Sequence, residues 1–132
     1  RLNITNKVYF TDYVSEEVLL KLYKCSDIAV FPSTYEPFGI VALEGMVAGI
    51  PVVVSDVGGL GEIVNHREDG MKFYSGNSNS LADCILELLK NKDLSESIKK
   101  TALQKVHKLY NWDSITEEIL DEYRYVISQH NS

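Results

Sequence analysis

The sequence predicts an α/β domain with a doubly wound, Rossmann-like parallel sheet. Two continuous apolar runs, at residues 28–31 and 52–54, lie on either side of a helical pattern that opens at Phe38 and Gly39 and ends near Gly49. Strands that are apolar at every residue are typical of a parallel sheet that is covered on both faces. Strand-like and helical segments alternate along much of the chain, and this order favours the same fold class.

The chain before this central unit predicts a short strand and an amphipathic helix. Residues 8–10 are apolar and strand-like, and a loop follows them. Ser15 is a good N-cap for a helix that runs through Lys24, and Glu16 and Glu17 suit the dipole of its first turn. The apolar face of this helix comprises Val18, Leu19, Leu22 and Tyr23.

The chain after the central unit predicts a glycine-rich turn at residues 55–61, a third strand at residues 71–73 and further helices. A short helix ends at residues 62–64, and Asp69 with Gly70 signals the turn before the strand. The later helices are expected at residues 80–91, from a capping box that begins at Asp93, and at residues 114–128. We expect an aromatic set to pack in the core, namely Trp112, Tyr23, Tyr110, Tyr123 and Tyr125.

Composition is that of one globular domain of 132 residues, with 45% hydrophobic and 24% charged residues. The net charge of −6 disfavours nucleic acid as a partner. Cys25 and Cys84 fit reduced core residues better than a disulfide or a metal site. Without a membrane span or a signal peptide, the sequence predicts a cytoplasmic protein. Because it starts at Arg1 before a strand-like segment, we expect a piece of a longer chain.

The candidate site lies where the first central strand ends. Glu36 stands in the loop after that strand, Gly39 opens the following helix to close approach, and Glu44 lies two turns into it. The first amides of a helix have no internal partner and carry partial positive charge, so a phosphate is their usual ligand. Two carboxylates beside a phosphate are better suited to accept hydrogen bonds from hydroxyl groups, for example of a sugar and a ribose.

Plainer interpretations compete with these assignments. Glu36 could be a solvated loop carboxylate, and Glu44 could pair with a lysine or cap a loop. Gly58 and Gly59 fit turn formers better than ligand contacts, and Ser33 fits a loop cap. The histidines are expected at the surface, at positions His66, His107 and His130.

The string PSTYEPFGIVALEGMVAGIPVV at residues 32–53 resembles the family-4-type glycosyltransferases of the GT-B fold, a group related to the glycogen synthases. The segment VGGLGE at residues 57–62 and Trp112 fit the same pattern, so the resemblance extends over residues 8–127. It implies the carboxy-terminal, donor-binding half of a retaining, metal-independent transferase. The donor is then a nucleoside-diphosphate sugar of the UDP, GDP or ADP type, and no cofactor is needed.

The resemblance also implies a role for each site residue. Glu36 would bind hydroxyls of the donor sugar and take the catalytic position, and the amides of Phe38 and Gly39 would seat that sugar. For the nucleotide, the amides of Ile40 and Val41 would bind the pyrophosphate, and Glu44 would bind the ribose. The loop at Tyr13 and Val14 would touch the nucleobase.

Two departures from the family pattern limit what this chain is expected to do. Asp12 stands where the family usually has glycine, and no segment before residue 8 matches the arginine and lysine that neutralise the pyrophosphate. We therefore expect weak nucleotide binding and no transfer without the amino-terminal, acceptor-binding half, which would also make any membrane contact. The alternatives are a non-catalytic nucleotide-sugar-binding module, a glycogen- or starch-synthase-type glucosyltransferase, and a GT-B-like epimerase or phosphorylase. Glu36 with Pro37, Phe38 and Gly39 argues against the epimerase and phosphorylase.

Overall fold

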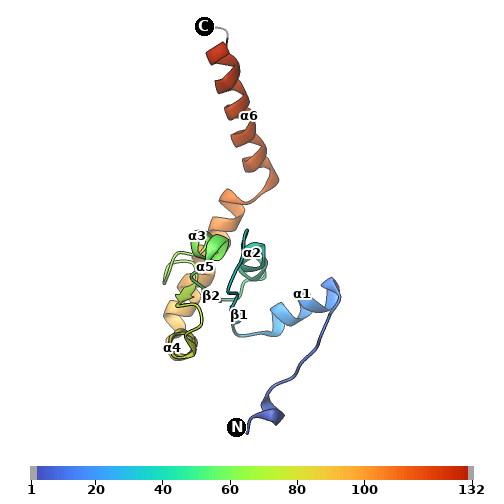
Figure 1. Cartoon of the computed structure of the whole chain (residues 1–132), viewed down its shortest axis with the longest axis vertical. Helices are drawn as coiled ribbons and strands as arrows, with labels where there is room; N and C mark the ends of the chain where they lie inside the picture. The colour runs from blue at the N-terminus through green and yellow to red at the C-terminus, as the bar shows by residue number, and fades with distance from the viewer. Residues whose placement is uncertain (1–2, 131–132) are drawn as a thin grey trace.

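The computed structural model describes residues 3–130 and places a parallel sheet at the centre of the chain (Figure 1). Within these residues the sheet has three strands in the order β1-β2-β3, namely β1 (Ala29–Phe31), β2 (Val52–Ser55) and β3 (Met71–Phe73). Val53 of the central strand pairs with Val30 on one side and with Met71 on the other. All three predicted central strands therefore form.

Helices connect and flank these strands. They are α1 (Glu16–Cys25), α2 (Ile40–Val47), α3 (Gly58–Ile63), α4 (Ser78–Lys90), α5 (Lys92–Leu109) and α6 (Trp112–His130), and a short 3-10 turn, η1 (Thr5–Lys7), precedes them. Each step from strand to strand passes through a helix, as a parallel sheet requires.

Two hydrophobic clusters cover the two faces of the sheet. Val52 and Val54 belong to a cluster with residues of α1, α2, α3 and α5, whereas Val53 belongs to a second cluster with α4 and Ile98 of α5. Because successive side chains of a strand point to opposite faces, this division follows directly from the run of three valines. The doubly wound α/β fold class is thereby confirmed.

Two helices, α4 and α5, begin at asparagine caps. The side chain of Asn77 accepts hydrogen bonds from the amides of Asn79 and Ser80, at 3.1 and 3.0 Å, so α4 begins at Ser78 rather than at residue 80. Asn91 accepts a hydrogen bond from the amide of Leu94 at 3.0 Å and begins α5 ahead of the predicted box at Asp93. Asparagine is among the best N-caps, and here it precedes the predicted start in both helices.

The predicted strand at residues 8–10 is wrong. These residues form no strand in the structure, and the side chains of Tyr9 and Phe10 are 87% and 86% exposed. A strand needs a neighbour to pair its backbone, and the chain before α1 runs apart from the sheet (Figure 1). β1 is correspondingly an edge strand, because within the described chain it pairs with β2 alone.

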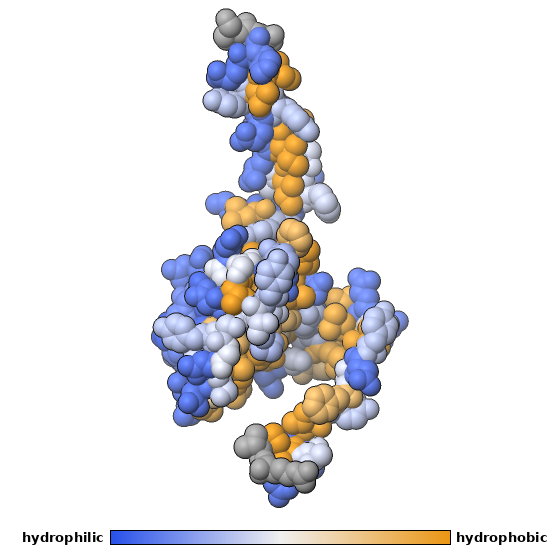
Figure 2. All heavy atoms as spheres, viewed as in Figure 1, coloured by the Kyte–Doolittle hydropathy of each residue, from blue (hydrophilic) through white to orange (hydrophobic). Residues whose placement is uncertain are grey.

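The prediction that Trp112 packs in the core is also wrong. Trp112 is 82% exposed at the start of α6, and Tyr110, Tyr123 and Tyr125 are exposed as well, whereas Tyr23 is buried. None of the described side chains of α6 is buried, and the helix extends away from the rest of the molecule (Figure 1). Figure 2 shows apolar side chains gathered along one side of α6. Periodicity identified this apolar face, but it cannot say what covers the face.

The predicted exposure of the histidines agrees with the structure, whereas that of the cysteines agrees only in part. Both cysteines are free, but only Cys84 is buried, so the core assignment is wrong for Cys25, which is exposed near the end of α1. His66, His107 and His130 are exposed, as predicted. Among residues 3–130, no helix combines the length and the apolar composition that crossing a bilayer requires.

Candidate functional site

The loops after β1 and β2 lie together at the carboxyl edge of the sheet. The hydroxyl of the fully buried Ser55, the last residue of β2, donates a hydrogen bond to the carbonyl of Ser33 at 2.5 Å. This contact ties the start of the Glu36 loop to the strand beside it. In open α/β sheets this edge is where ligands bind, so the structure places the predicted loop in the expected position.

Two hydrogen bonds position Glu36, one to its backbone and one to its side chain. Its carbonyl accepts a hydrogen bond from the amide of Gly59 at 2.8 Å, and its side-chain Oε1 accepts one from the amide of Gly39 at 3.3 Å. The residue is half-buried between the starts of α2 and α3. Its carboxylate therefore has a defined position at the mouth of α2, with Oε1 engaged by the protein's own backbone.

Three glycines make this close packing possible. A Cβ on Gly58 would lie 2.3 Å from the carbonyl oxygen of Glu36, and one on Gly59 would lie 2.4 Å from the carbonyl carbon of Phe38. A Cβ on Gly39, whose φ is +73°, would lie 2.8 Å from the carbonyl carbon of Gly59. These distances are too short for any side chain, so Gly58 and Gly59 have a packing role. They lie in the first turn of α3, so the glycine-rich turn predicted through residue 61 ends where this helix begins.

The start of α2 has a buried glycine, Gly39, between two exposed residues. Gly39 occupies the N-cap position in the left-handed conformation and offers no side chain to the first amides, and the first turn contains no acidic residue. Phe38 and Ile40, on either side of Gly39, are exposed. The amides of Ile40 and Val41 belong to the first turn, where a helix lacks internal acceptors and its dipole favours an anion. The geometry suits an oxyanion such as a phosphate.

Glu44 lies on α2 beyond this helix start and has a partner that sequence reasoning missed. The hydroxyl of Tyr23, on α1, donates a hydrogen bond to Glu44 Oε2 at 3.4 Å. Burial of the ring raises the pKa of Tyr23, and the neighbouring Glu44 carboxylate raises that pKa further. The sequence marked Tyr23 as a core residue through its helical spacing, but no local pattern could identify the residue that its hydroxyl meets.

The structure places five of the predicted site residues close together in the chain, a sixth on the same helix and a seventh on a different segment. Glu36, Phe38, Gly39, Ile40 and Val41 share one loop and helix start, and Glu44 follows on the same helix. Val14, the predicted base contact, lies on a different segment, in the loop before α1, where it is half-buried.

The nearby cations are engaged by the protein itself. Lys72 of β3 pairs with Asp56 at 3.0 Å and donates a hydrogen bond to the carbonyl of Gly61 at 3.1 Å. Lys105 of α5 pairs with Asp69 at 2.7 Å. Among the described residues, no group of three or more histidine, cysteine, aspartate or glutamate side chains could hold a metal ion. With these two lysines already paired, the backbone at the start of α2 offers a separate source of favourable charge for an anion.

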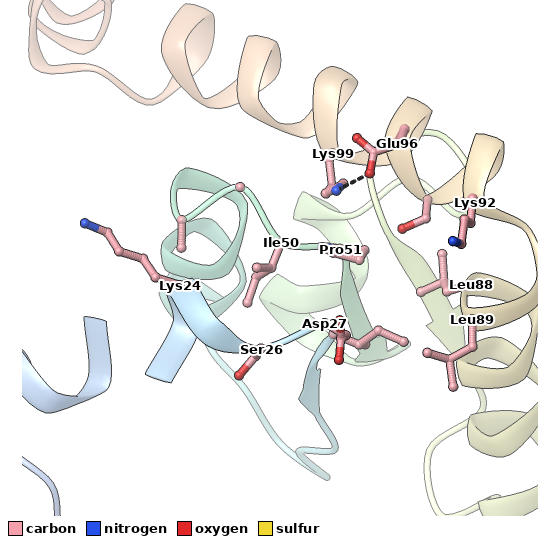
Figure 3. Close-up of a pocket in the computed structure, with 14 residues that line it drawn as sticks. Lys24, Ser26, Asp27, Ile50, Pro51, Leu88, Leu89, Lys92, Glu96 and Lys99 are labelled. Carbon is pink, nitrogen blue, oxygen red and sulfur yellow. Dashed lines mark ion pairs between the residues drawn. The ribbon is translucent and has the colours of Figure 1, made fainter. Parts of the chain in front are cut away.

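A cavity of about 570 Å³ lies at the opposite edge of the sheet (Figure 3). Its walls include residues just before β1 and β2, such as Asp27 and Pro51, together with residues of α4 and α5. Lys99 in its wall is paired with Glu96, and Lys24 points away from the cavity (Figure 3). Because ligands of such sheets bind at the carboxyl ends of the strands, this cavity is not the predicted site.

Comparison with known proteins identifies the family. Residues 1–105 match the family described as glycosyl transferases group 1. The chain belongs to the group 1 glycosyltransferases. It is 44% identical over 124 residues to an uncharacterized glycosyltransferase of Methanocaldococcus jannaschii, in an alignment that covers 94% of this chain and 32% of that relative.

Solved structures agree with this assignment to the group 1 glycosyltransferases. Sucrose-phosphate synthase from Thermosynechococcus elongatus superposes with a TM-score of 0.82 and 33% identity, over 96% of this chain and 32% of that one. Anabaena HepE in complex with UDP and glucose superposes with a TM-score of 0.81 and 26% identity, over 92% and 33% of the two chains. The predicted GT-B resemblance is thereby confirmed. This chain spans about a third of the length of these proteins.

Proposed function

We propose that this group 1 glycosyltransferase chain binds the nucleoside-diphosphate sugar of a retaining, metal-independent transferase. The observation that carries the proposal is the start of α2, which has no side-chain cap from its N-cap residue, with Glu36 beside it and Glu44 further along the same helix. A diphosphate at the amides of Ile40 and Val41 would extend toward a sugar on one side and a ribose on the other. The complex of the related HepE with UDP and glucose supports this class of ligand.

Each residue then has a chemical task. Transfer breaks the bond between the anomeric carbon and the diphosphate, so negative charge grows on the departing phosphate oxygen. Preorganised amides at a helix start stabilise that charge without having to reorient. Glu36 accepts hydrogen bonds from hydroxyl groups of the donor sugar and fixes its orientation, while Glu44 accepts hydrogen bonds from the ribose hydroxyls. The amides of Phe38 and Gly39 would seat the sugar once Gly39 exchanges its contact with Glu36 for the ligand.

We further propose that the acceptor is bound by an amino-terminal half that precedes this domain in the full-length transferase. Doubly wound sheets often have the strand order 3-2-1-4-5-6. If β1, β2 and β3 are the last three strands of such a sheet, the strand that pairs with the open edge of β1 comes from earlier in the full-length chain. This arrangement accounts for the open edge of β1.

The exposed apolar face of α6 fits the same proposal. Its members Ile119, Leu120, Tyr123, Val126 and Ile127 are all exposed, on a helix that extends from the domain (Figure 2). Burial of such a face against a second domain is favourable by about 25 cal/mol for each Å² of apolar surface removed from water. An earlier part of the full-length chain would then supply both the acceptor-binding half and the basic residues that neutralise a diphosphate. This chain alone would bind a nucleotide weakly and transfer nothing.

The proposal is tested by titrating UDP, GDP, ADP and their glucose conjugates into the chain and following binding by NMR and calorimetry. One nucleotide class should bind, and Glu44→Ala should weaken it by about 1.5–3 kcal/mol, because a hydrogen bond to a charged group is lost. Glu118→Ala, which removes an exposed carboxylate from α6, is the matched control and should bind like the parent chain. Equal binding by the parent and Glu44→Ala would refute the assignment of Glu44.

Transfer is tested separately. Measurable turnover of a sugar nucleotide by this chain alone would refute the need for a second half. In a chain extended to the length of its relatives, turnover that is lost in Glu36→Gln would contradict a purely nucleotide-sugar-binding module. The anomeric configuration of the product, read by NMR, decides between retention and inversion.

A further inference from the structure

Tyr23 joins α1 to the core beneath α2. It is the buried residue of α1, with 8% of its surface exposed, and it belongs to the cluster that contains Ala42 and Met46 of α2. Burial of the ring against these residues leaves its hydroxyl to find a polar partner, because an unpaired buried hydroxyl costs free energy. That partner is Glu44 Oε2, at 3.4 Å.

Glu44 is exposed, so it depends on this contact for its orientation. Within residues 3–130 its carboxylate forms no ion pair, and the hydroxyl of Tyr23 is its hydrogen-bond donor. A glutamate side chain has several rotatable bonds, and restricting it costs conformational entropy whenever a ligand has to do so. A donor on Oε2 restricts the carboxylate beforehand, and among the described residues no donor contacts Oε1.

The phenol is suited to this task at neutral pH. Burial and the Glu44 carboxylate both raise the pKa of Tyr23 above its ordinary value of 10.0, so the hydroxyl keeps its proton. A protonated phenol donates to a carboxylate, and at an oxygen–oxygen distance of 3.4 Å this hydrogen bond is a long one, so its contribution is modest.

We propose that Tyr23 is a positioning residue for Glu44, which it holds ready to accept hydrogen bonds from the vicinal hydroxyls of a ribose. The inference rests on the proposed function and deepens it, because it assigns a residue outside the family's sugar and phosphate contacts. It also gives a reason for placing a tyrosine here, since phenylalanine would fill the same space in the core. Preorganisation of this kind raises affinity by lowering the ordering cost of binding rather than by adding a contact to the ligand.

The test compares ribose-containing and ribose-lacking ligands on the parent chain and on Tyr23→Phe. The ligands are the nucleoside diphosphate that binds best and its 2′,3′-dideoxy analogue, titrated by NMR. We expect Tyr23→Phe to weaken the ribonucleotide about three- to tenfold, the size of one modest hydrogen-bond contribution. The dideoxy analogue has no hydroxyls for Glu44, so its affinity should change less than about twofold.

Two further variants isolate the role of the hydroxyl. Tyr110→Phe removes a phenolic hydroxyl from an exposed tyrosine beyond α5 and should leave both affinities unchanged. In the background Glu44→Gln, Tyr23→Phe should have less than about half of its effect on a logarithmic scale, because contacting residues are not additive.

The outcomes separate the inference from the function on which it rests. Weakening of the ribonucleotide alone supports the positioning role, with thermal unfolding confirming that Tyr23→Phe is folded. Equal weakening of both ligands would mark Tyr23 as merely structural and overturn the inference, as would unchanged binding of both. If the parent chain binds no nucleotide at all, the proposed function fails and the inference fails with it.

Discussion

Asp69 and Lys105 form a buried ion pair that fastens the turn before β3 to α5. Asp69 is 2% exposed, and its Oδ2 lies 2.7 Å from Lys105 Nζ, while its Oδ1 accepts a hydrogen bond from the amide of Asn65 at 2.7 Å. Lys105 also donates to the carbonyl of Ile63 at the end of α3. One lysine thus connects α5 to the helix whose start holds the Glu36 loop.

Removal of this lysine should destabilise the fold strongly. Lys105→Met leaves the Asp69 carboxylate buried without its cation, and breaking a buried pair in this way costs about 3–5 kcal/mol. Lys21→Met is the matched control, because it breaks an exposed pair with Glu17 that is worth about 0.3–0.5 kcal/mol. Urea unfolding of both variants measures the difference. Similar losses in the two variants would contradict a structural role for the buried pair.

The glycine contacts at the rim predict unequal effects of adding a methyl group. Gly59→Ala would place a Cβ 2.4 Å from the backbone of Phe38, so the Glu36 loop must move and nucleotide binding should fall together with stability. Gly76→Ala is the comparison, because its surroundings are open but its φ is +74°; it should cost about 1 kcal/mol and leave binding intact. Normal binding by folded Gly59→Ala would show that the loop tolerates displacement.

The stability of the folded protein should depend on alkaline pH through the titration of Tyr23. Its pKa is raised in the folded protein above 10.0, so the folded state holds the phenolic proton more tightly than the unfolded chain does. The resulting stabilisation is complete below the unfolded pKa and is lost as the pH rises through the folded pKa. The parent chain should therefore lose stability relative to Tyr23→Phe as the pH rises above about 10, as measured by urea unfolding. A constant difference as the pH rises would contradict the raised pKa.

The two thiols should react at very different rates. Cys25 is exposed, whereas Cys84 is buried, and burial together with Glu87 and Asp83 raises the pKa of its thiol. Because the thiolate is the reactive form, a disulfide reagent at neutral pH should modify one thiol quickly and the other only slowly. Cys25→Ser should remove the fast phase. Persistence of a fast phase in that variant would show that Cys84 is accessible.

Sequence reasoning was most successful where the signal was local. The run of valines at residues 52–54 predicted a strand buried on both faces, and Val53 faces a different cluster from its two neighbours. The helix start at Gly39 was also predicted, because glycine and the loop before it mark the boundary. The predicted starts of α4 and α5 are late by up to two residues, because the asparagine caps at Asn77 and Asn91 precede the signals at residue 80 and Asp93.

Features that depend on distant partners could not be predicted from local signals. Residues 8–10 have the composition of a strand, but strand formation requires a neighbour that the described chain does not provide. Trp112 is a large aromatic residue of the kind that usually packs in a core, but it lies exposed because no other part of the described chain covers it. The contact between Tyr23 and Glu44 joins two helices that are separated in the chain by a strand and a loop. The local sequence around either residue therefore cannot predict it.

The three glycines at the rim have a consequence for how donor preference could change. Because backbone meets backbone there, no compressible side-chain layer separates α3 from the loop that carries Glu36. A small tilt of α3 would therefore move the loop that carries Glu36, the residue that we propose binds the donor sugar. Adaptation to a new sugar would draw substitutions to positions on α3 that never touch the ligand, as well as to the lining of the binding site.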